Sequence, residues 1–199
     1  MRALLLLAAL LAIPAVAQTG GVHVDSVVVV RDLPAYSPGM GLQEGPYTLF
    51  SLRDARVVVG PTDAVRIDSA STAWDLGVRG TTVIVNGGVS GPGQGAAALL
   101  RTPFEAVTTV PTDSLVVDGD NACPRGTGLA ICTGSGNGWY LYSGNGVTPI
   151  ADRTLVVRLA EGGAARLRFL DYTLGEPDAT GERPRLYTFE YALLPDGSE

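Results

Sequence analysis

The side chains that could ligate a metal or serve as a general base are few in this sequence. His23 is the only histidine, and Met40 is the only methionine besides Met1. Imidazole and thioether groups are common protein ligands of haem iron, and imidazole is also the usual general base. Chemistry that needs these groups would therefore depend on two residues near the start of the chain.

Cys123 and Cys132 are the only cysteines. In an exported chain such a pair is typical of a disulfide, which would stabilise the fold by roughly 2–3 kcal/mol through the short loop that it closes. The alternative is a metal site with two thiolates, but no histidine lies near either cysteine in the sequence and an exported protein meets oxidising conditions. We expect a disulfide and no metal site.

The sequence lacks the patterns of the common catalytic sites. A Ser-His-Asp or Cys-His arrangement would have to recruit His23, and no nucleophile-elbow motif is present. Asp75, Asp118 and Asp120 could converge for carboxylate chemistry, although nothing in the sequence pairs them. The glycine-rich stretch 86–95 lacks the lysine and hydroxyl of a phosphate-binding loop, which favours a connection between strands. We expect a binding protein and not an enzyme.

The N-terminal segment has the features of an export signal. Arg2 supplies a positive charge, residues 3–13 form an apolar run too short to cross a bilayer, and Ala15-Val16-Ala17 fits a cleavage site. We expect a signal peptide at 1–17 and a mature domain at 18–199. Because no cysteine follows the cleavage site for lipidation, we expect a soluble protein in the periplasm or outside the cell.

The charge of the chain argues against large anionic partners. All 14 basic residues are arginines, and the formal net charge is −6. Such a chain has no overall attraction for nucleic acid or an anionic membrane, and an anionic small molecule would need local arginines. No segment after the signal is apolar over the length of a membrane helix. We expect no nucleic-acid partner and no transmembrane segment.

The rest of the chain has the alternating and β-branched runs of an all-β protein. Its 26 glycines and 13 prolines separate short runs, as in an antiparallel sandwich or barrel-like sheet. We expect one domain with a loop at 32–46 and a main sheet at 47–194, in which Glu161-Gly162-Gly163 forms a hairpin turn. The expected strands are 22–30, 47–52, 56–59, 74–79, 81–86, 96–100, 115–118, 139–142, 154–159, 165–172 and 186–194.

Several stretches of the chain carry a family resemblance. They are AWDLGVRGTTVIVNGGVSGPGQG at 73–95, FEAVTTVPTD at 104–113, GWYLY at 138–142, RTLVVR at 153–158 and YTFEY at 187–191. In this order they closely resemble the HmuY family, secreted haem-binding proteins of bacteria, over nearly all of the mature chain. The resemblance implies an HmuY-like β domain, haem as the cofactor and a haemophore-like role in iron acquisition.

The resemblance also implies a haem held between two axial side chains, His in some members and Met in others. One ligand of the His type lies on the strand after the Trp-Asp pair, where this chain has Arg79, and a guanidinium has no free lone pair for iron. The second lies in the connection that corresponds to 117–136, which contains neither His nor Met. The usual bis-His pair is therefore absent. Arg79, with Arg53 or Arg56, could instead pair with haem propionates or another carboxylate, or simply face solvent.

Other side chains could still take part in haem binding. Met40 lies between two glycines and could approach a flat ligand, or it could be an ordinary loop methionine. His23 could also ligate iron, although a residue near the mature N-terminus commonly frays. Tyr36 or Tyr47 could supply a phenolate as an iron ligand. Either could instead pack against neighbouring side chains without a role in binding. Met40, His23, Tyr47 and Arg79 are the candidates for haem binding.

An aromatic run at 139–142 offers a different kind of surface. Strand alternation predicts Trp139 and Leu141 on one face and Tyr140 and Tyr142 on the other. One pair would enter the core, and the other could form an exposed aromatic platform for a flat ligand, a sugar or a protein. Core packing alone would also explain the run.

Two functions follow from these observations. The first is an exported, non-catalytic binding protein for haem or a related tetrapyrrole that uses ligands other than the usual pair. The second is an interaction module of the cell envelope that recognises a host or envelope protein, or a glycan, on the same scaffold and binds no haem.

Overall fold

The computed structural model describes residues 26–36, 45–63, 67–124, 126–144, 146–177 and 183–195. These residues form antiparallel β-sheets, and the helical elements among them are the short 3₁₀ turns η1 (Ile67–Ala70), η2 (Phe104–Ala106) and η3 (Thr112–Ser114). The predicted all-β class is therefore confirmed, although the sheets do not close into a barrel. None of the helical elements in these ranges has the length and apolar character needed to cross a bilayer.

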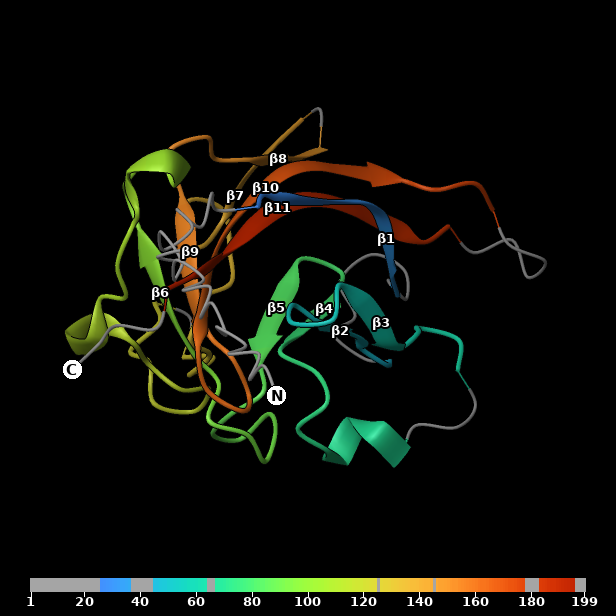
Figure 1. Ribbon diagram of the computed structural model, residues 1–199. Coiled ribbons are helices and arrows are strands. Elements are labelled where there is room, and N and C mark those ends of the chain that lie inside the picture. Colours follow the sequence, from blue (N-terminus) through green and yellow to red (C-terminus); the bar gives the residue numbers. More distant parts are fainter. Residues whose placement is uncertain are drawn as a thin grey trace, which may run out of the picture.

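The larger sheet has the strand order β1-β11-β10-β9-β6 (Figure 1). Its strands are β1 (Val28–Ala35), β6 (Ala96–Leu100), β9 (Thr154–Arg158), β10 (Ala164–Leu174) and β11 (Arg185–Leu194). Strands β9, β10 and β11 form the predicted meander, because each pairs antiparallel with the next. The expected turn at 161–163 joins the first two, and its last two residues have positive φ angles of 94° and 78° that suit glycine.

The smaller sheet has the order β3-β2-β4-β5 and lies beneath the long strands of the larger one (Figure 1). It contains β2 (Thr48–Ser51), β3 (Arg56–Val59), β4 (Leu76–Arg79) and β5 (Thr82–Val85). A separate hairpin consists of β7 (Tyr140–Ser143) and β8 (Gly146–Pro149). The main sheet expected at 47–194 is thus divided into separate sheets.

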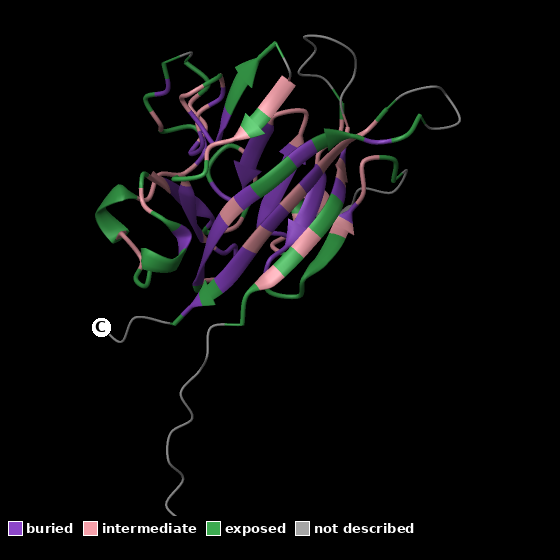
Figure 2. Cartoon of the chain, turned by 90° about the horizontal axis from the view of Figure 1, so that it is seen from above, coloured by how far each residue is buried: buried purple, intermediate pink, exposed green. Residues whose placement is uncertain are grey.

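The hydrophobic core lies between the two sheets. Buried positions are concentrated in the strands, as Figure 2 shows. Strand β4 contributes Leu76 and Val78 to the core, while β11 contributes Tyr187, Phe189 and Tyr191. Because side chains alternate along a strand, the residues of β4 between and after these core positions face away from the core.

The N-terminal strand differs from the sequence prediction in where it ends. Residues 32–35 belong to β1 and not to the loop expected at 32–46, although Asp32 has a positive φ of 52° at a register shift. Pro34 indicated a loop, but β1 is an edge strand of the sheet, where a missing N–H donor is tolerated. The part of the expected 22–30 strand before residue 26 lies outside the described residues.

Two other strand predictions were wrong. Residues 115–118 form no strand, because only Val116 makes a bridge, to Ala97, before the chain turns at Asp118. Strand β8 was missed, since the short polar run at 146–149 ends in a proline and has no apolar alternation.

Candidate ligand site

Arg79 and Tyr47 lie side by side on the outward face of the smaller sheet. Thr48 pairs with Val78 in the β2–β4 ladder, so the residues next to them, Tyr47 and Arg79, are neighbours across the two strands. The Cζ atom of Arg79 lies 4.2 Å from the centroid of the Tyr47 ring, which is a cation–π contact. Nη1 of Arg79 donates a hydrogen bond of 2.8 Å to the carbonyl oxygen of Gly45.

The electrostatics of this pair follow from partial burial. Arg79 is half-buried, and its Nε atom is shielded from solvent without a hydrogen-bond partner among the described residues. Burial raises the pKa of Tyr47, while the charge of Arg79 lowers it and that of Asp118 raises it further. The Tyr47 phenol is therefore protonated at neutral pH, which makes it a poor iron ligand unless the metal itself displaces the proton.

The turn between β4 and β5 is fixed by tyrosines of the larger sheet. The carbonyl oxygen of Gly80 accepts hydrogen bonds from the hydroxyls of Tyr172, at 2.9 Å, and Tyr187, at 2.7 Å. Burial raises the pKa of both phenols, so both stay protonated and can donate. The N–H of Gly80 donates to the carbonyl oxygen of Tyr36. These contacts, with the Arg79–Gly45 bond, attach residues 36 and 45 to the same turn.

The aromatic run does not form the alternating platform expected from the sequence. Trp139 and Tyr140 are both buried, whereas Leu141 is 51% and Tyr142 67% exposed. Trp139 precedes β7, so it does not follow the pleat of that strand. Its indole N–H donates to the carbonyl oxygen of Thr81, and its ring lies 4.5 Å from that of Phe169. Trp139 and Tyr140 thus support the fold, and Tyr142 is the surface aromatic.

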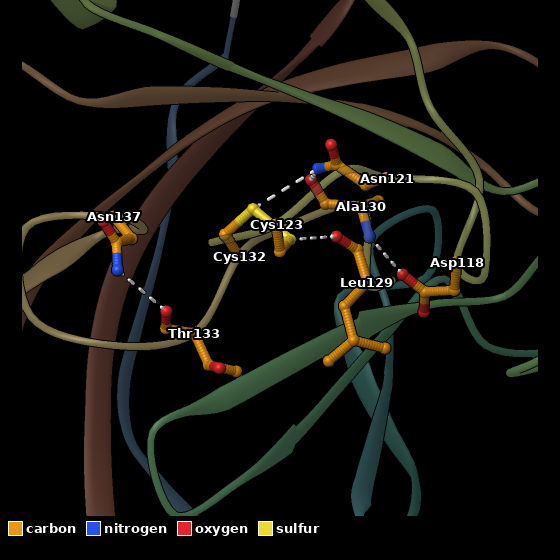
Figure 3. Close-up of a disulfide and its surroundings, with 8 residues drawn as sticks. All are labelled: Asp118, Asn121, Cys123, Leu129, Ala130, Cys132, Thr133 and Asn137. Carbon is orange, nitrogen blue, oxygen red and sulfur yellow. Dashed lines mark hydrogen bonds between the residues drawn. A yellow bond between two sulfur atoms is a disulfide. The ribbon is translucent and has the colours of Figure 1, made fainter. Parts of the chain in front are cut away.

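The predicted disulfide joins Cys123 and Cys132, whose Cα atoms are 5.3 Å apart (Figure 3). The side-chain amide of Asn121 donates to the carbonyl oxygen of Ala130 across the same loop, at 2.9 Å. Leu129 packs against the apolar cluster of Leu49, Val59, Trp74 and Ile84 on the outward face of the smaller sheet, as Tyr47 does. The disulfide loop therefore borders the surface that carries Tyr47 and Arg79.

The candidate carboxylates Asp75 and Asp118 are buried and bind backbone amides. Asp75 accepts from the N–H groups of Leu52, at 2.8 Å, and Ala160, at 2.9 Å. Asp118 accepts from the N–H groups of Val85, at 3.0 Å, and Ala130, at 2.7 Å. Burial raises the pKa of Asp118, while its hydrogen bonds lower it. Asp75 links the two sheets, and Asp118 ties the disulfide loop to β5.

Asn86 is a structural residue that the sequence analysis did not single out. Its side-chain amide donates to the carbonyl oxygens of Ser71 and Trp74, and its Oδ1 accepts from the N–H of Gly93. A Cβ atom on Gly95 would lie 2.5 Å from the Asn86 carbonyl oxygen, so the close return of the chain requires glycine. The glycine-rich stretch is a connection between β5 and β6, as expected.

The remaining candidates are not brought together with Arg79. His23 and Met40 lie outside the described residues. Arg53 donates to the carbonyl oxygen of Gly162, at the end of β10 opposite to Tyr172 and the Gly80 turn. Arg56 forms an exposed ion pair with Asp54. Within the part of the chain that the structure describes, no group of three or more His, Cys, Asp or Glu side chains could hold a metal.

Comparisons with solved structures found several that are similar to this chain. Similar solved structures include apo PinO from Porphyromonas gingivitis, with 16% identity over 85% of this chain and 98% of the other and a TM-score of 0.49. A protein from Bacteroides vulgatus described as HmuY-like and haem-binding has 18% identity over 84% and 90% and a TM-score of 0.46. An apo HmuY analogue from Tannerella forsythia has 14% identity over 87% and 97% and a TM-score of 0.42.

No curated protein matches the sequence. The family model described as HmuY protein matches residues 46–191, a range that includes Tyr47, Arg79 and the disulfide loop. A match over this much of the chain identifies its family. The protein belongs to the HmuY family.

Proposed function

We propose that this protein is an exported, non-catalytic binding protein for haem or a related tetrapyrrole that uses ligands other than the usual pair of its family. Membership of the HmuY family over residues 46–191 is the observation that carries the proposal. The position of the usual ligand on the strand after Trp74-Asp75 faces outward in this chain and is occupied by Arg79.

The proposed binding surface is the outward face of the smaller sheet around Tyr47 and Arg79, bordered by the disulfide loop. Met40 remains our candidate for an iron ligand, since it follows Tyr36 by four positions and precedes Gly45 by five. Tyr36 and Gly45 both bond to the Arg79–Gly80 turn. His23 is a second candidate, and Tyr47 a weaker one because of its raised pKa.

Absorbance titration of the mature protein, residues 18–199, with haemin tests the proposal. We expect a saturable shift of the Soret band, because coordination or burial changes the electronic environment of the porphyrin. Met40→Ala should change the spectrum of the complex if the thioether ligates iron, and His23→Ala is the matched test of the imidazole. If neither substitution changes it, Tyr47 or hydrophobic capture remains as the binding mode.

Absence of saturable haemin binding would contradict the proposal. It would favour the interaction module that recognises a protein or glycan, and pull-down from an envelope extract would then be the next test. Export is tested separately by N-terminal sequencing of the secreted protein, for which we expect a first residue of Gln18.

A further inference from the structure

We propose that Arg79, stacked on Tyr47, is a carboxylate-recognition site, so that the ligand of this protein is bound as an acid and its metal is dispensable. The inference rests on the proposed function, because it names the chemical feature by which the same surface would hold a tetrapyrrole. Haem and iron-free protoporphyrin share two propionate groups. A guanidinium binds such a carboxylate through parallel N–H donors in a geometry that no other side chain provides.

Arg79 is a half-buried cation without a counter-ion among the described residues. No ion pair in those ranges includes it, and its shielded Nε atom has no hydrogen-bond partner there. A cation that has lost part of its hydration without gaining an anion is unfavourable in a protein. A carboxylate that reaches the remaining Nη protons of Arg79 would gain charge-assisted hydrogen bonds and restore charge balance at the site, although the shielded Nε atom itself is not accessible to it.

The guanidinium is already held in place before a ligand arrives. Its face rests on the Tyr47 ring at 4.2 Å, and Nη1 bonds to the carbonyl oxygen of Gly45 at 2.8 Å. The next residue, Gly80, is fixed by the hydroxyls of Tyr172 and Tyr187. A donor that is held in this way loses little conformational entropy on binding, which favours affinity.

The nearby carboxylate of Asp118 does not take the place of the ligand. It acts on Tyr47 through its charge, but its oxygens accept hydrogen bonds from the N–H groups of Val85 and Ala130. It is therefore committed to holding the disulfide loop. Because the chain carries a net charge of −6, a carboxylate ligand would be attracted by local positive charge such as that of Arg79 and not by the molecule as a whole.

Quenching of tryptophan fluorescence measures binding without the need for iron. Trp74 and Trp139 are the only tryptophans, and both are buried. The wild-type mature protein is titrated with haemin, with iron-free protoporphyrin IX and with protoporphyrin IX dimethyl ester. We expect the two acids to bind with dissociation constants within about threefold of each other. The ester should bind roughly 10- to 100-fold more weakly, because it cannot form the charge-assisted hydrogen bonds that a carboxylate forms with Arg79.

Substitutions then assign the effect to Arg79. Arg79→Gln should lower the affinity for haemin and for protoporphyrin IX by roughly 10- to 100-fold and leave the affinity for the ester unchanged. The affinity of Arg79→Lys for the two acids should lie between those of wild type and Arg79→Gln, because lysine keeps the positive charge but lacks the planar guanidinium with its parallel donors. Arg53→Gln is the matched control, since Arg53 also donates to a glycine carbonyl, at 2.9 Å, but lies at the far end of the sheet.

Two results would overturn the carboxylate role and leave the proposed function standing. One is equal affinity of the acid and its ester for the wild-type protein, which needs no substitution and so cannot arise from misfolding. The other is equal haemin affinity in Arg79→Gln and Arg53→Gln, with both variants folded by circular dichroism. Saturable binding of neither haemin nor protoporphyrin IX would overturn the inference and the proposed function together.

Discussion

The environments of Arg79 and Tyr140 depend on contacts between segments that are distant in the sequence as well as on strand alternation. Arg79 is next to the core residue Val78 in β4 and lies on the opposite face of that strand. The stacking on Tyr47 could not be predicted, because it depends on the register of two strands that are distant in the sequence. The burial of Tyr140 together with Trp139 could not be predicted from the sequence either, because Trp139 precedes β7 and does not follow the alternation of that strand.

At the residue scale, Tyr47→Phe separates the two roles of this ring. Phenylalanine keeps an aromatic face under the guanidinium and removes the phenol, so the Soret spectrum and affinity of the haemin complex should not change. Tyr47→Leu should weaken binding by about two- to fivefold, the equivalent of roughly 0.5–1 kcal/mol for a cation–π contact. A changed spectrum in Tyr47→Phe would show instead that the phenolate ligates iron.

A second residue-scale prediction concerns the buried Asp118. Its folded pKa lies above the ordinary value of 3.8 because of desolvation, so the native state holds this proton more tightly than the unfolded chain. The contribution of Asp118 to stability is therefore greatest at low pH and falls as the pH rises from about 4 through the raised pKa.

Chemical denaturation of wild type and Asp118→Asn across this range measures the effect. The free energy of unfolding of wild type minus that of the variant should decrease with rising pH and then level off. The variant should also lose roughly 1–3 kcal/mol at every pH, because the amide nitrogen of asparagine is a donor and leaves one of the two backbone N–H groups without an acceptor. A difference that increases with pH would mean that Asp118 has a lowered pKa.

At the scale of elements, the connections position the candidate site more than the strands do. The β4–β5 turn is held from above by β10 and β11, and the disulfide loop is tied to β5 through Asp118. The sequence predicts most of the strands because most have a local period, and it misses β8, which has none. It does not predict which loop packs on which sheet, since contacts such as that of Leu129 with the outward cluster are non-local. The cysteine pair was predictable because the chain has only two cysteines.

Removal of the disulfide tests the role of that loop. The double variant Cys123→Ser and Cys132→Ser should lower the free energy of unfolding by roughly 2–3 kcal/mol, measured by urea denaturation, because the unfolded chain gains loop entropy. If the loop borders the ligand surface, the same variant should bind haemin more weakly under conditions where it is fully folded. Unchanged affinity would place the ligand away from the loop, and wild type with a reductant is the control.

At the scale of the whole molecule, an all-β fold follows from composition and periodicity, whereas its division into two packed sheets does not. The long alternating runs of β10 and β11 required a sheet with one buried face. The edge position of β1, which tolerates Pro34, could only come from the pairing with β11. The HmuY family domain thus spans both sheets, from residue 46 to residue 191.

The most direct test of this account is the stoichiometry of haemin binding to the purified mature protein, followed by absorbance in the Soret region. We predict a titration that saturates at one haemin per chain. Haemin that shows only the spectrum of the free compound at every ratio of ligand to protein would contradict the account.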